Sequence, residues 1–498
     1  MRRLIAAGSA VALLLAIAPA VAQASPADPC EQAYTAPMNS TAKLKAYLDC
    51  RLDRLDSRVG VYPVPGPTVT ATVEVPGPTA TATATVTVTA SSTPTPSVTP
   101  TPTATATVTQ DPPASLLDLP RIAWEGGPDY WAQFPDASDW TDPSFFPIGI
   151  WFNGLSTDAQ AQWDKAHGIN TYVGMDPSTD FALFERNGLY WLGPQRITNA
   201  PEHSENWPGV FLADEPDGVG DASGITILEA AKAQAPAGKF TYANYTQIVI
   251  ENDLAQSISE AYVNFPDAVS ADQYFYTTPW CDWSNFRGSA RTPPIDQATC
   301  RTASSYGKML DTLTRRDAAD GILSPRWGFV ENFNGMPSGD QSVYMTADQA
   351  KGAAMNSIIH EARGLFWFNQ SFSGSCRSSA VLRDAQVQGS GWCGSAAVEG
   401  MGEVNNLVHA LAPVINTQSY QWKFGDGLDT MLKAYDGYAY VFAMTDGTTG
   451  SRTFTLPSGI SGTSVEVLNE GRTLTVDNGT FSDNFAAENT YHIYRIKI

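Results

Sequence analysis

Short apolar runs alternate with amphipathic stretches through the middle of the chain. The runs are rich in aromatic and β-branched residues, and charged or turn-forming residues bound them, as is typical of buried strands. We therefore expect each run to form a strand. The eight runs lie at 145–152, 170–175, 189–193, 209–213, 239–245, 268–276, 326–330 and 364–369.

The stretches between these runs have the pattern of surface helices. The segment 156–168 begins with a Ser-Thr pair that can cap a helix, and Gly168 can end it. The segment 345–364 has the same pattern, with Thr346 at its start and Gly364 at its end. The order of elements is therefore strand, helix, strand, repeated along the chain.

Repeated strand–helix units of this length predict a (β/α)8 TIM barrel over residues 114–415. A doubly wound open sheet is the alternative. It is less favoured because no glycine-rich phosphate-binding turn follows any of the runs.

The pattern changes after the last expected helix, at 399–415, where Pro413 lies near the end. From residue 416 to residue 498 the chain alternates short strand-like runs with turn signals such as Asp446-Gly447. This pattern predicts a small antiparallel β-sandwich. It contains no catalytic cluster, so we expect a structural role.

The N-terminal part is not globular in composition. Residues 1–24 combine two arginines, an apolar run and small residues, the pattern of a secretory signal peptide cleaved after Ala24. Residues 61–113 are rich in Thr and Pro and nearly free of charge, which predicts a disordered linker. No other stretch is long and apolar enough to span a membrane, so we expect no membrane contact after cleavage.

A short helix is expected in residues 25–60, between the signal and the linker. Leu44, Leu48, Leu52 and Leu55 share one helical face. Such a short helix is marginal alone. It is either a small disulfide-tied cap or an oligomerising helix.

Six cysteines fit an oxidising, extracellular location. Proximity in sequence suggests Cys30–Cys50, Cys281–Cys300 and Cys376–Cys393, although six cysteines allow about fifteen pairings. A zinc site is the alternative. It is less favoured because the sequence has no CxxC motif and no histidine at metal spacing beside a cysteine.

The charge balance narrows the choice of partner. Lys plus Arg number 30 against 51 Asp plus Glu, a formal charge of -21. Such an acidic chain argues against a nucleic-acid partner, which needs a basic surface. A neutral ligand suits an acidic protein rich in Trp and Tyr better.

The segment GVFLADEPDG (209–218) runs an apolar strand into Asp214, Glu215 and Asp217. Placing charge beside buried apolar surface is unfavourable unless the charge is paired or used. In a barrel these residues follow the fourth strand, on the face where active sites lie. Pro216 has no N–H for a ladder, which suits the place where the strand stops.

The seventh expected strand ends in the same way, with Glu331 and then Asn332. Two glutamates at strand ends on one face would share a pocket. The charge of one carboxylate would then raise the pKa of the other. One carboxyl that donates a proton and one that stays ionised are the groups that cleave glycosides. The alternative is that each glutamate is only a solvated strand end.

With these motifs, the chain from about residue 115 onward resembles the clan A glycoside hydrolases, including galactosidase- and glucanase-like members. FLADEPD and GFVEN carry the resemblance, together with FFPIGIW and NNLVHALAPVI. It implies that Glu215 is the acid/base and Glu331 the nucleophile. It also implies an aromatic floor at Trp367 and a tyrosine, Tyr274 or Tyr276, that hydrogen-bonds the nucleophile.

Asp214 departs from that family, which usually has Asn before the acid/base as a donor to the sugar 2-hydroxyl. An ionised Asp accepts hydrogen bonds instead, which leaves the sugar open. Further candidates for substrate contact are Trp151, Asn332 and Trp280. Asp272 either lines the cleft or serves as a cap or ion-pair partner.

These observations predict a secreted retaining glycoside hydrolase that acts on a poly- or oligosaccharide without a cofactor or metal. The alternative is a non-catalytic carbohydrate-binding or host-attachment protein on an inactive barrel. A helix, a Thr/Pro stalk and a large domain also resemble host-surface proteins carried by actinobacterial phages. The expected location is extracellular, with the cell surface and the virion included.

Deleting residues 25–113 should leave the melting temperature of the rest of the chain almost unchanged, because the Thr/Pro-rich linker cannot bury a core. Thermal unfolding of the full chain and of the truncated chain measures this. A fall of several degrees would show that the N-terminal segment stabilises the barrel.

Overall fold

The computed structural model describes residues 117–174, 179–193, 197–250, 254–277, 281, 295–338 and 341–498. The expected signal peptide, the helical segment with Cys30–Cys50, and the Thr/Pro linker lie outside these residues. Trp280 also lies outside them.

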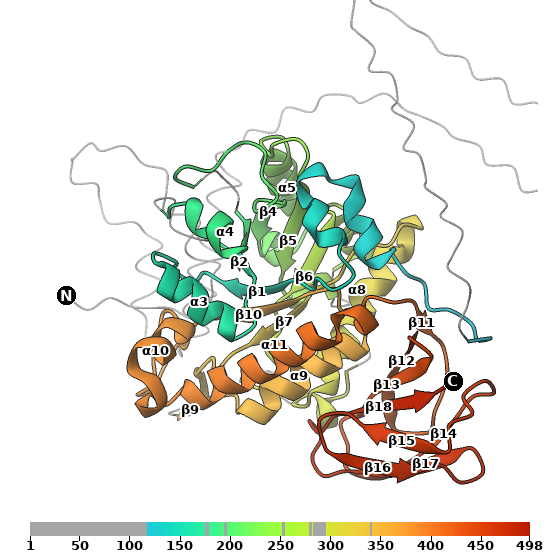
Figure 1. Ribbon diagram of the computed structural model, residues 1–498. Coiled ribbons are helices and arrows are strands. Elements are labelled where there is room, and N and C mark those ends of the chain that lie inside the picture. Colours follow the sequence, from blue (N-terminus) through green and yellow to red (C-terminus); the bar gives the residue numbers. More distant parts are fainter. Residues whose placement is uncertain are drawn as a thin grey trace, which may run out of the picture. The chain divides into compact units, whose positions relative to one another are not determined.

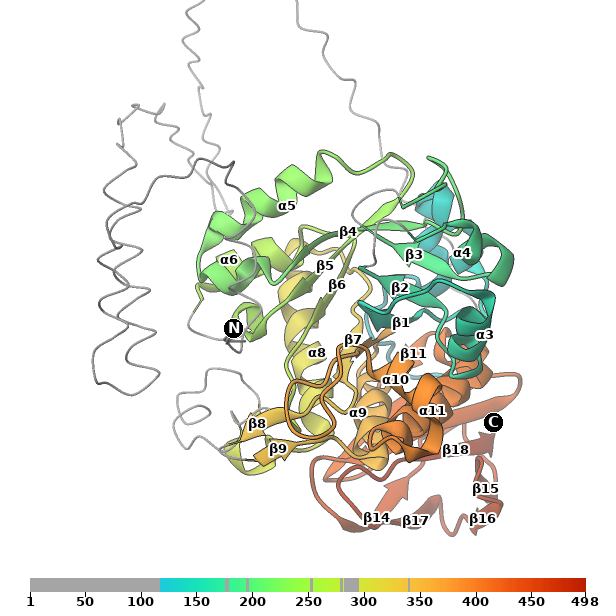
Figure 2. The same cartoon turned by 90° about the vertical axis from the view of Figure 1, so that its left-hand side faces the viewer.

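Eight parallel strands form the centre of the fold (Figure 1), and each lies within one of the eight predicted runs or extends it by one residue. The helices surround these strands in both views (Figure 2). The strands are β1 (Ile148–Trp151), β2 (Thr171–Val173), β3 (Tyr190–Leu192), β4 (Gly209–Asp214), β5 (Phe240–Tyr245), β6 (Ala268–Ala271), β7 (Gly328–Glu331) and β10 (Leu365–Phe368).

The strands form two ladders, β3-β2-β1-β10-β7 and β4-β5-β6. Two contacts join the ladders into a ring. A parallel bridge pairs Val269 of β6 with Arg326, just before β7. On the other side, the Trp191 N–H of β3 donates to the Asn206 carbonyl, just before β4, at 2.8 Å. The ring is a (β/α)8 barrel, as the sequence predicts.

Helices follow most of the strands. Residues 197–208, the described part of the β3–β4 connection beyond residue 193, contain no helix, so this unit departs from the expected repeat. A short antiparallel ladder, β8 (Met336–Ser338) with β9 (Gln341–Val343), follows β7. The helices are α3 (Asp158–Ala166), α4 (Ala182–Asn187), α5 (Ile225–Lys232), α6 (Gln256–Val263), α8 (Ser304–Asp317), α9 (Ala347–Ile359), α10 (Val381–Gln388) and α11 (Ser395–Ile415).

Helix α9 shows how a local signal sets a boundary. Thr346 and Gln349 form a capping box at its start, as the sequence suggests. Its end differs from the prediction, because the helix stops at Ile359 and Glu361 takes the left-handed conformation, with φ 67. Gly364 has another role. A Cβ there would lie 2.8 Å from the Trp327 ring, so glycine is needed for close packing.

The barrel interior is filled with aromatic rings. Trp327 packs on Tyr242 and Phe366, with ring centroids 4.5 and 4.7 Å apart. At the end opposite the C-terminal strand ends, Trp131 and Trp140 pack on Phe240, at 4.8 and 5.1 Å. Such rings supply a large buried apolar area.

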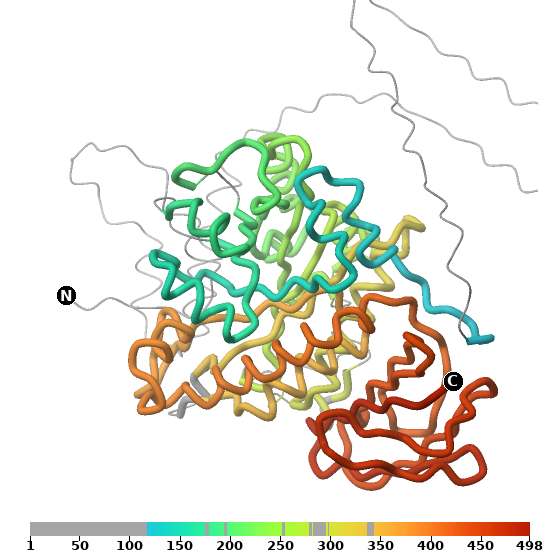
Figure 3. The backbone as a smooth tube through the Cα atoms, in the orientation of Figure 1, coloured from blue at the N-terminus to red at the C-terminus, as the bar shows by residue number. Residues whose placement is uncertain are grey.

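The chain passes from α11 into antiparallel strands (Figure 3). Six of them form one sheet in the order β11-β12-β13-β18-β15-β16, and β14 pairs with β17. Phe454 of β14 and Phe481 of β17 stack at 4.6 Å and contact Tyr494 of β18, which gives the predicted β-sandwich a core. The strands are β11 (Ser419–Tyr420), β12 (Leu428–Tyr435), β13 (Tyr438–Thr445), β14 (Gly450–Thr455), β15 (Ser464–Val467), β16 (Arg472–Thr475), β17 (Thr480–Phe485) and β18 (His492–Lys497).

Buried ion pairs join the sandwich to the barrel. Lys433 of β12 is fully buried and lies 3.4 Å from Glu361, just after α9, while its Nζ donates to the Thr417 carbonyl at 2.7 Å. Arg363 contacts the same Glu361 carboxylate at 3.1 Å and Glu125 at 2.7 Å. Because buried charges must be paired, these contacts fix the two parts of the chain together.

His360, the residue after α9, lies between two carboxylates. Its Nδ1 is 3.0 Å from Asp311 of α8, and its Nε2 is 3.7 Å from Asp429 of β12. Burial opposes its charge, but Asp311 and Asp429 outweigh burial and raise the pKa of His360 to about 10. His360 is therefore protonated at neutral pH.

His360→Gln should lower the free energy of unfolding by about 3 kcal/mol at pH 6.5, because it leaves two partly buried carboxylates without their cation. The pKa of His360 is higher in the folded than in the unfolded chain, so its stabilisation is present below about pH 6.5 and is lost as pH rises toward 10. Denaturant unfolding at pH 6.5 and 9.5 should therefore show a smaller loss at the higher pH. His203→Gln, at a largely exposed histidine, is the control. Equal losses at both pH values would contradict the assignment.

Candidate active site

Three acidic side chains lie where parallel strands end on the same edge of the barrel. Glu215 follows β4, Asp272 follows β6, and Glu331 is the last residue of β7. Asp214, the last residue of β4, lies beside Glu215. The carboxyl ends of barrel strands carry the active sites of this fold.

The end of β4 is shaped so that its acidic residues face different partners. The register against β5 shifts between Phe211 and Ala213, and such a bulge re-aims the residues after it. As a result Asp214 pairs with Asn244 of β5, whose Nδ2 donates to the Asp214 carboxylate at 3.0 Å. Glu215 then takes the left-handed conformation, with φ 50, a strained geometry for a residue with a side chain.

Asp217 holds this turn in place. Its buried carboxylate accepts hydrogen bonds from the Thr246 N–H and hydroxyl at 2.9 and 2.8 Å, and from the Val249 N–H at 2.9 Å. Burial raises the pKa of Asp217 to about 6, and these hydrogen bonds oppose the rise. Asp217 is therefore a structural residue, and Asp214 and Glu215 remain for chemistry.

Asp214, Glu215 and Asp272 form one cluster. The Asp272 and Glu215 carboxyls lie close enough for each to shift the pKa of the other. Burial, together with the charges of Glu215 and Asp214, raises the pKa of Asp272 well above its usual range. Burial also raises the pKa of Glu215, although the hydrogen bond from Asp272 opposes the rise. Burial and these charges both favour the protonated form of Asp272 more than in an ordinary carboxyl.

Asp214 lies at the open side of the cluster. Its side chain reaches solvent although protein surrounds most of it. Burial raises its pKa to about 7, with a contribution from the charge of Glu215, while the Asn244 amide opposes the rise. Near neutral pH, Asp214 is therefore divided between its protonated and ionised forms.

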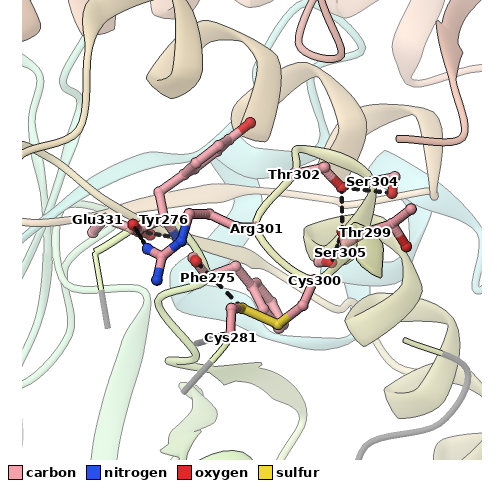
Figure 4. The surroundings of a disulfide bond; sticks show 10 residues. All are labelled: Phe275, Tyr276, Cys281, Thr299, Cys300, Arg301, Thr302, Ser304, Ser305 and Glu331. Carbon is pink, nitrogen blue, oxygen red and sulfur yellow. Dashed lines mark hydrogen bonds between the residues drawn. A yellow bond between two sulfur atoms is a disulfide. The ribbon is translucent and has the colours of Figure 1, made fainter. Parts of the chain in front are cut away.

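Glu331 has a different environment, and Figure 4 shows it beside Tyr276 and Arg301. Its side chain has no solvent exposure. One oxygen accepts the Tyr276 N–H at 3.1 Å, and the other accepts the hydroxyl of Tyr306, near the start of α8. Burial raises the pKa of Glu331 to about 7, and the hydrogen bonds from Tyr306 and the backbone oppose the rise by favouring the ionised form.

Tyr274 lies close to both sets of carboxyls. Burial first, and then the charges of Asp272, Glu215, Asp214 and Glu331, raise the pKa of its phenol well above the usual range. Its hydroxyl donates to Asp272 at 3.3 Å. The charges of the glutamates of β4 and β7 thus both reach the phenol of Tyr274.

The tyrosine that hydrogen-bonds Glu331 differs from the one that the family resemblance implies. The hydroxyl of Tyr274 contacts Asp272, and the hydroxyl of Tyr276 contacts Glu488 at 2.7 Å. Tyr276 contributes its backbone N–H instead, and Tyr306 supplies the hydroxyl. The sequence around Tyr306 has no signal that marks it, because it is one aromatic residue on an amphipathic helix.

Trp367 also departs from its expected place. It is fully buried on the outer face of β10, where its Nε1 donates to Asn405 of α11 at 2.9 Å. The neighbouring Phe368 belongs to the interior aromatic cluster and packs on Tyr274, with centroids 5.0 Å apart. Consecutive strand residues face opposite sides, so only one of the two can reach the mouth.

Of the other predicted substrate contacts, Trp151 lies on the inner face of the barrel and Asn332 does not. Trp151 ends β1 on the inner face, with its ring 5.1 Å from both Phe211 and Phe329. Asn332 is buried away from the cluster and its amide donates to Met401 of α11 at 3.2 Å. Asp272 is the acidic residue that sequence reasoning undervalued. The sequence placed it inside the expected run 268–276, whereas in the structure β6 ends at Ala271 and Asp272 follows it.

The disulfides Cys281–Cys300 and Cys376–Cys393 are formed as sequence proximity suggests. Among the described residues, no group of three or more His, Cys, Asp or Glu side chains is arranged to hold a metal ion. None of the helices in the described ranges is both long and apolar enough to cross a membrane.

No protein-family model matches the chain, and no curated protein matches it in sequence. Among solved structures it is similar to a GH30 endoxylanase from Clostridium papyrosolvens, with 10% identity over 71% of this chain and 97% of that one, at a TM-score of 0.37. A family 51 α-L-arabinofuranosidase from Bifidobacterium longum gives 11% identity, 72% and 96% coverage, and a TM-score of 0.39. Function has to be argued from the site, because one fold supports many activities.

Changing Asp272 or Asp217 to asparagine should alter the free energy of unfolding in opposite directions. Asp272 keeps its proton when folded and loses it when unfolded, so its burial costs more stability as pH rises above about 4. Asp272→Asn removes that cost and should raise the free energy of unfolding at pH 8 by at least about 1 kcal/mol. The gain should be smaller at pH 5.

Asp217→Asn is the matched control. Both of its carboxylate oxygens accept hydrogen bonds from backbone N–H groups, so an amide nitrogen would face a donor. This variant should lose about 2 kcal/mol at pH 5, and less at pH 8, because the raised pKa of Asp217 makes its own burial costlier above about pH 6. Denaturant unfolding at pH 5 and 8 measures both effects. A destabilised Asp272→Asn protein at pH 8 would show that Asp272 is ionised and paired.

Proposed function

We propose that this chain is a retaining glycoside hydrolase in which Glu215 is the acid/base and Glu331 the nucleophile. The observation that supports it is the contrast between the two glutamates. Burial raises the pKa of Glu215, whereas both oxygens of Glu331 accept hydrogen bonds that favour its ionised form. Pairs of carboxyls whose surroundings favour opposite protonation states are how such enzymes divide acid and nucleophile roles.

In the first step, the ionised Glu331 attacks the anomeric carbon and forms a glycosyl ester. The bond to the leaving oxygen breaks as Glu215 gives that oxygen its proton. In the second step, Glu215 takes a proton from water, the water oxygen attacks the anomeric carbon, and Glu331 is released as a carboxylate.

The aromatic and polar groups at the mouth fit a sugar. Trp151, Tyr274 and Phe368 present rings on the inner face, and sugar rings stack on such surfaces. Asp214 stands where related enzymes have Asn. With a pKa of about 7, it carries a proton over the acidic half of the pH range and can then donate to a sugar hydroxyl as Asn does.

We also propose that the protein is secreted. Disulfides such as Cys281–Cys300 and Cys376–Cys393 persist in oxidising compartments and support this. The substrate would then be a poly- or oligosaccharide outside the cell. The proposed parts are a signal peptide, a helical segment, a linker, a catalytic barrel and a β-sandwich, over 1–24, 25–60, 61–113, 114–415 and 416–498.

A second candidate function is carbohydrate binding without cleavage. The observation that favours it is the absence of solvent exposure at Glu331, which a substrate must reach in the first mechanism. In the hydrolase, covering side chains such as Tyr274 have to move when a sugar binds. In a binding protein they would stay in place.

The experiment starts from the full chain and a panel of aryl glycosides with acidic phenol leaving groups, together with plant, fungal and actinobacterial wall glycans. Glu331→Gln removes the attacking charge and should abolish cleavage of every substrate, a loss of at least about 10⁴-fold. Glu215→Gln should still react with the activated aryl glycosides in the first step and then accumulate the intermediate, because water lacks its general base.

Added azide needs no deprotonation, so it should restore turnover of Glu215→Gln and yield a glycosyl azide of retained configuration. Glu205→Gln, at an exposed glutamate that contacts Ser138, is the control and should behave as the wild type. An inverted azide product would indicate a different mechanism. Binding of a glycan that no preparation cleaves would support the carbohydrate-binding function instead.

A further inference from the structure

Tyr276 is held at three points. Its N–H donates to Glu331 at 3.1 Å, its carbonyl accepts a close hydrogen bond from the Arg301 guanidinium, and its hydroxyl donates to Glu488 at 2.7 Å. Figure 4 shows the first two contacts beside the Cys281–Cys300 disulfide. The orientation of the peptide that contacts Glu331 therefore depends on residues beyond it.

Glu488 also holds the start of α8. Its second carboxylate oxygen accepts the N–H of Ala303, the residue before that helix, at 2.8 Å. The first turn of α8 contains no acidic residue of its own. A carboxylate at a helix N-terminus satisfies a free N–H and interacts favourably with the helix dipole. Glu488 thus supplies from elsewhere in the chain the charge that α8 lacks.

Both hydrogen bonds to Glu331 therefore lead back to one carboxylate. The first comes from Tyr276, whose hydroxyl Glu488 accepts, and the second comes from Tyr306 on the helix that Glu488 caps. A displacement of Glu488 would loosen both segments together. The disulfide and Arg301 also tie the Tyr276 segment to the chain just before α8, because Cys300 and Arg301 lie just before Ala303.

Glu488 belongs to the C-terminal sandwich, in the loop between β17 and β18. Its position is well defined. Ala487 and Thr490 hydrogen-bond each other across the turn at 2.9 and 3.1 Å. Asn489 packs against Gly352 of α9, where a Cβ would lie 2.7 Å from the Asn489 side chain. The loop is thus seated against the barrel at a glycine.

We propose that Glu488 is a positioning residue for Glu331, so that the sandwich sets the geometry of a catalytic group in the barrel. The proposal rests on the proposed function for its catalytic consequence, but the positioning itself is independent of any substrate. The titratable and charged groups that face Glu331 and Glu488 are Tyr274, Tyr276, Tyr306 and Arg301. None of these four side chains is acidic, so Glu331 and Glu488 are the two acidic groups in this set of contacts.

The first test measures the protonation of Glu331 without a substrate. In protein labelled with ¹³C at the glutamate carboxyls, Glu331→Gln identifies the Glu331 signal. The hydrogen bonds to Glu331 favour its ionised form, so loosening them in Glu488→Ala should move its titration midpoint upward by at least about half a pH unit. Tyr276→Phe removes only the hydroxyl contact and should give a smaller shift in the same direction.

Glu466→Gln is the matched control, because Glu466 lies in the same sandwich and pairs with Arg495 at 2.5 Å on the surface. It should leave the Glu331 midpoint unchanged. If Glu488→Ala does not fold, the Glu331 titration midpoint is measured in Tyr276→Phe and Glu488→Gln instead. An unchanged Glu331 midpoint in the folded variants would overturn the proposal.

The second test uses an aryl glycoside that the wild type cleaves. Misplacing a nucleophile lowers the rate of the chemical step more than binding, so Glu488→Ala should lower kcat at least about tenfold with little change in KM. An equal loss in the Glu466→Gln control would overturn the proposal. If no glycoside is cleaved, the proposed function fails while the NMR titration still decides whether Glu488 positions Glu331.

Discussion

A carboxyl group inside a protein must be hydrogen-bonded, paired with a cation or protonated, and the acidic residues of this barrel show all three solutions. Asp217 accepts three hydrogen bonds and fixes the turn after β4. Glu361 is paired with Lys433 and Arg363. Burial and neighbouring charges raise the pKa of Asp272 well above its usual range, which favours its protonated form. The chemistry available at the mouth follows from which solution each carboxyl has.

The same requirement explains why the sandwich is more than an appended module. The residues that neutralise buried charge around α9 come from both parts of the chain, with Lys433 and Asp429 on β12 and His360 and Glu361 after α9. Glu488 adds a contact nearer the site. Sequence patterns could not reveal these pairs, because each partner is far from the other in the chain and is unremarkable in its local context.

The sequence was sufficient to predict the strands and the acidic residues at their ends, because both are local signals. It could not decide which face a barrel strand residue takes. GLFWFN is apolar throughout, as expected for a strand buried on both sides, so no alternation distinguishes Trp367 from Phe368. Tyr306 could not be predicted from the sequence as a partner of Glu331 for another reason. It approaches Glu331 from a helix whose position depends on the assembled barrel.

The backbone at Glu215 has a consequence for how this sequence has been selected. Its left-handed conformation is easy for glycine and tolerable for asparagine, but it costs a glutamate on the order of 1 kcal/mol. A chain selected for stability alone would replace Glu215 with glycine and gain from the change. Glu361 takes the same conformation and is held by Lys433 and Arg363, whereas Glu215 has no such ion pair among the described residues, so libraries screened only for heat resistance would be expected to replace Glu215 before Glu361.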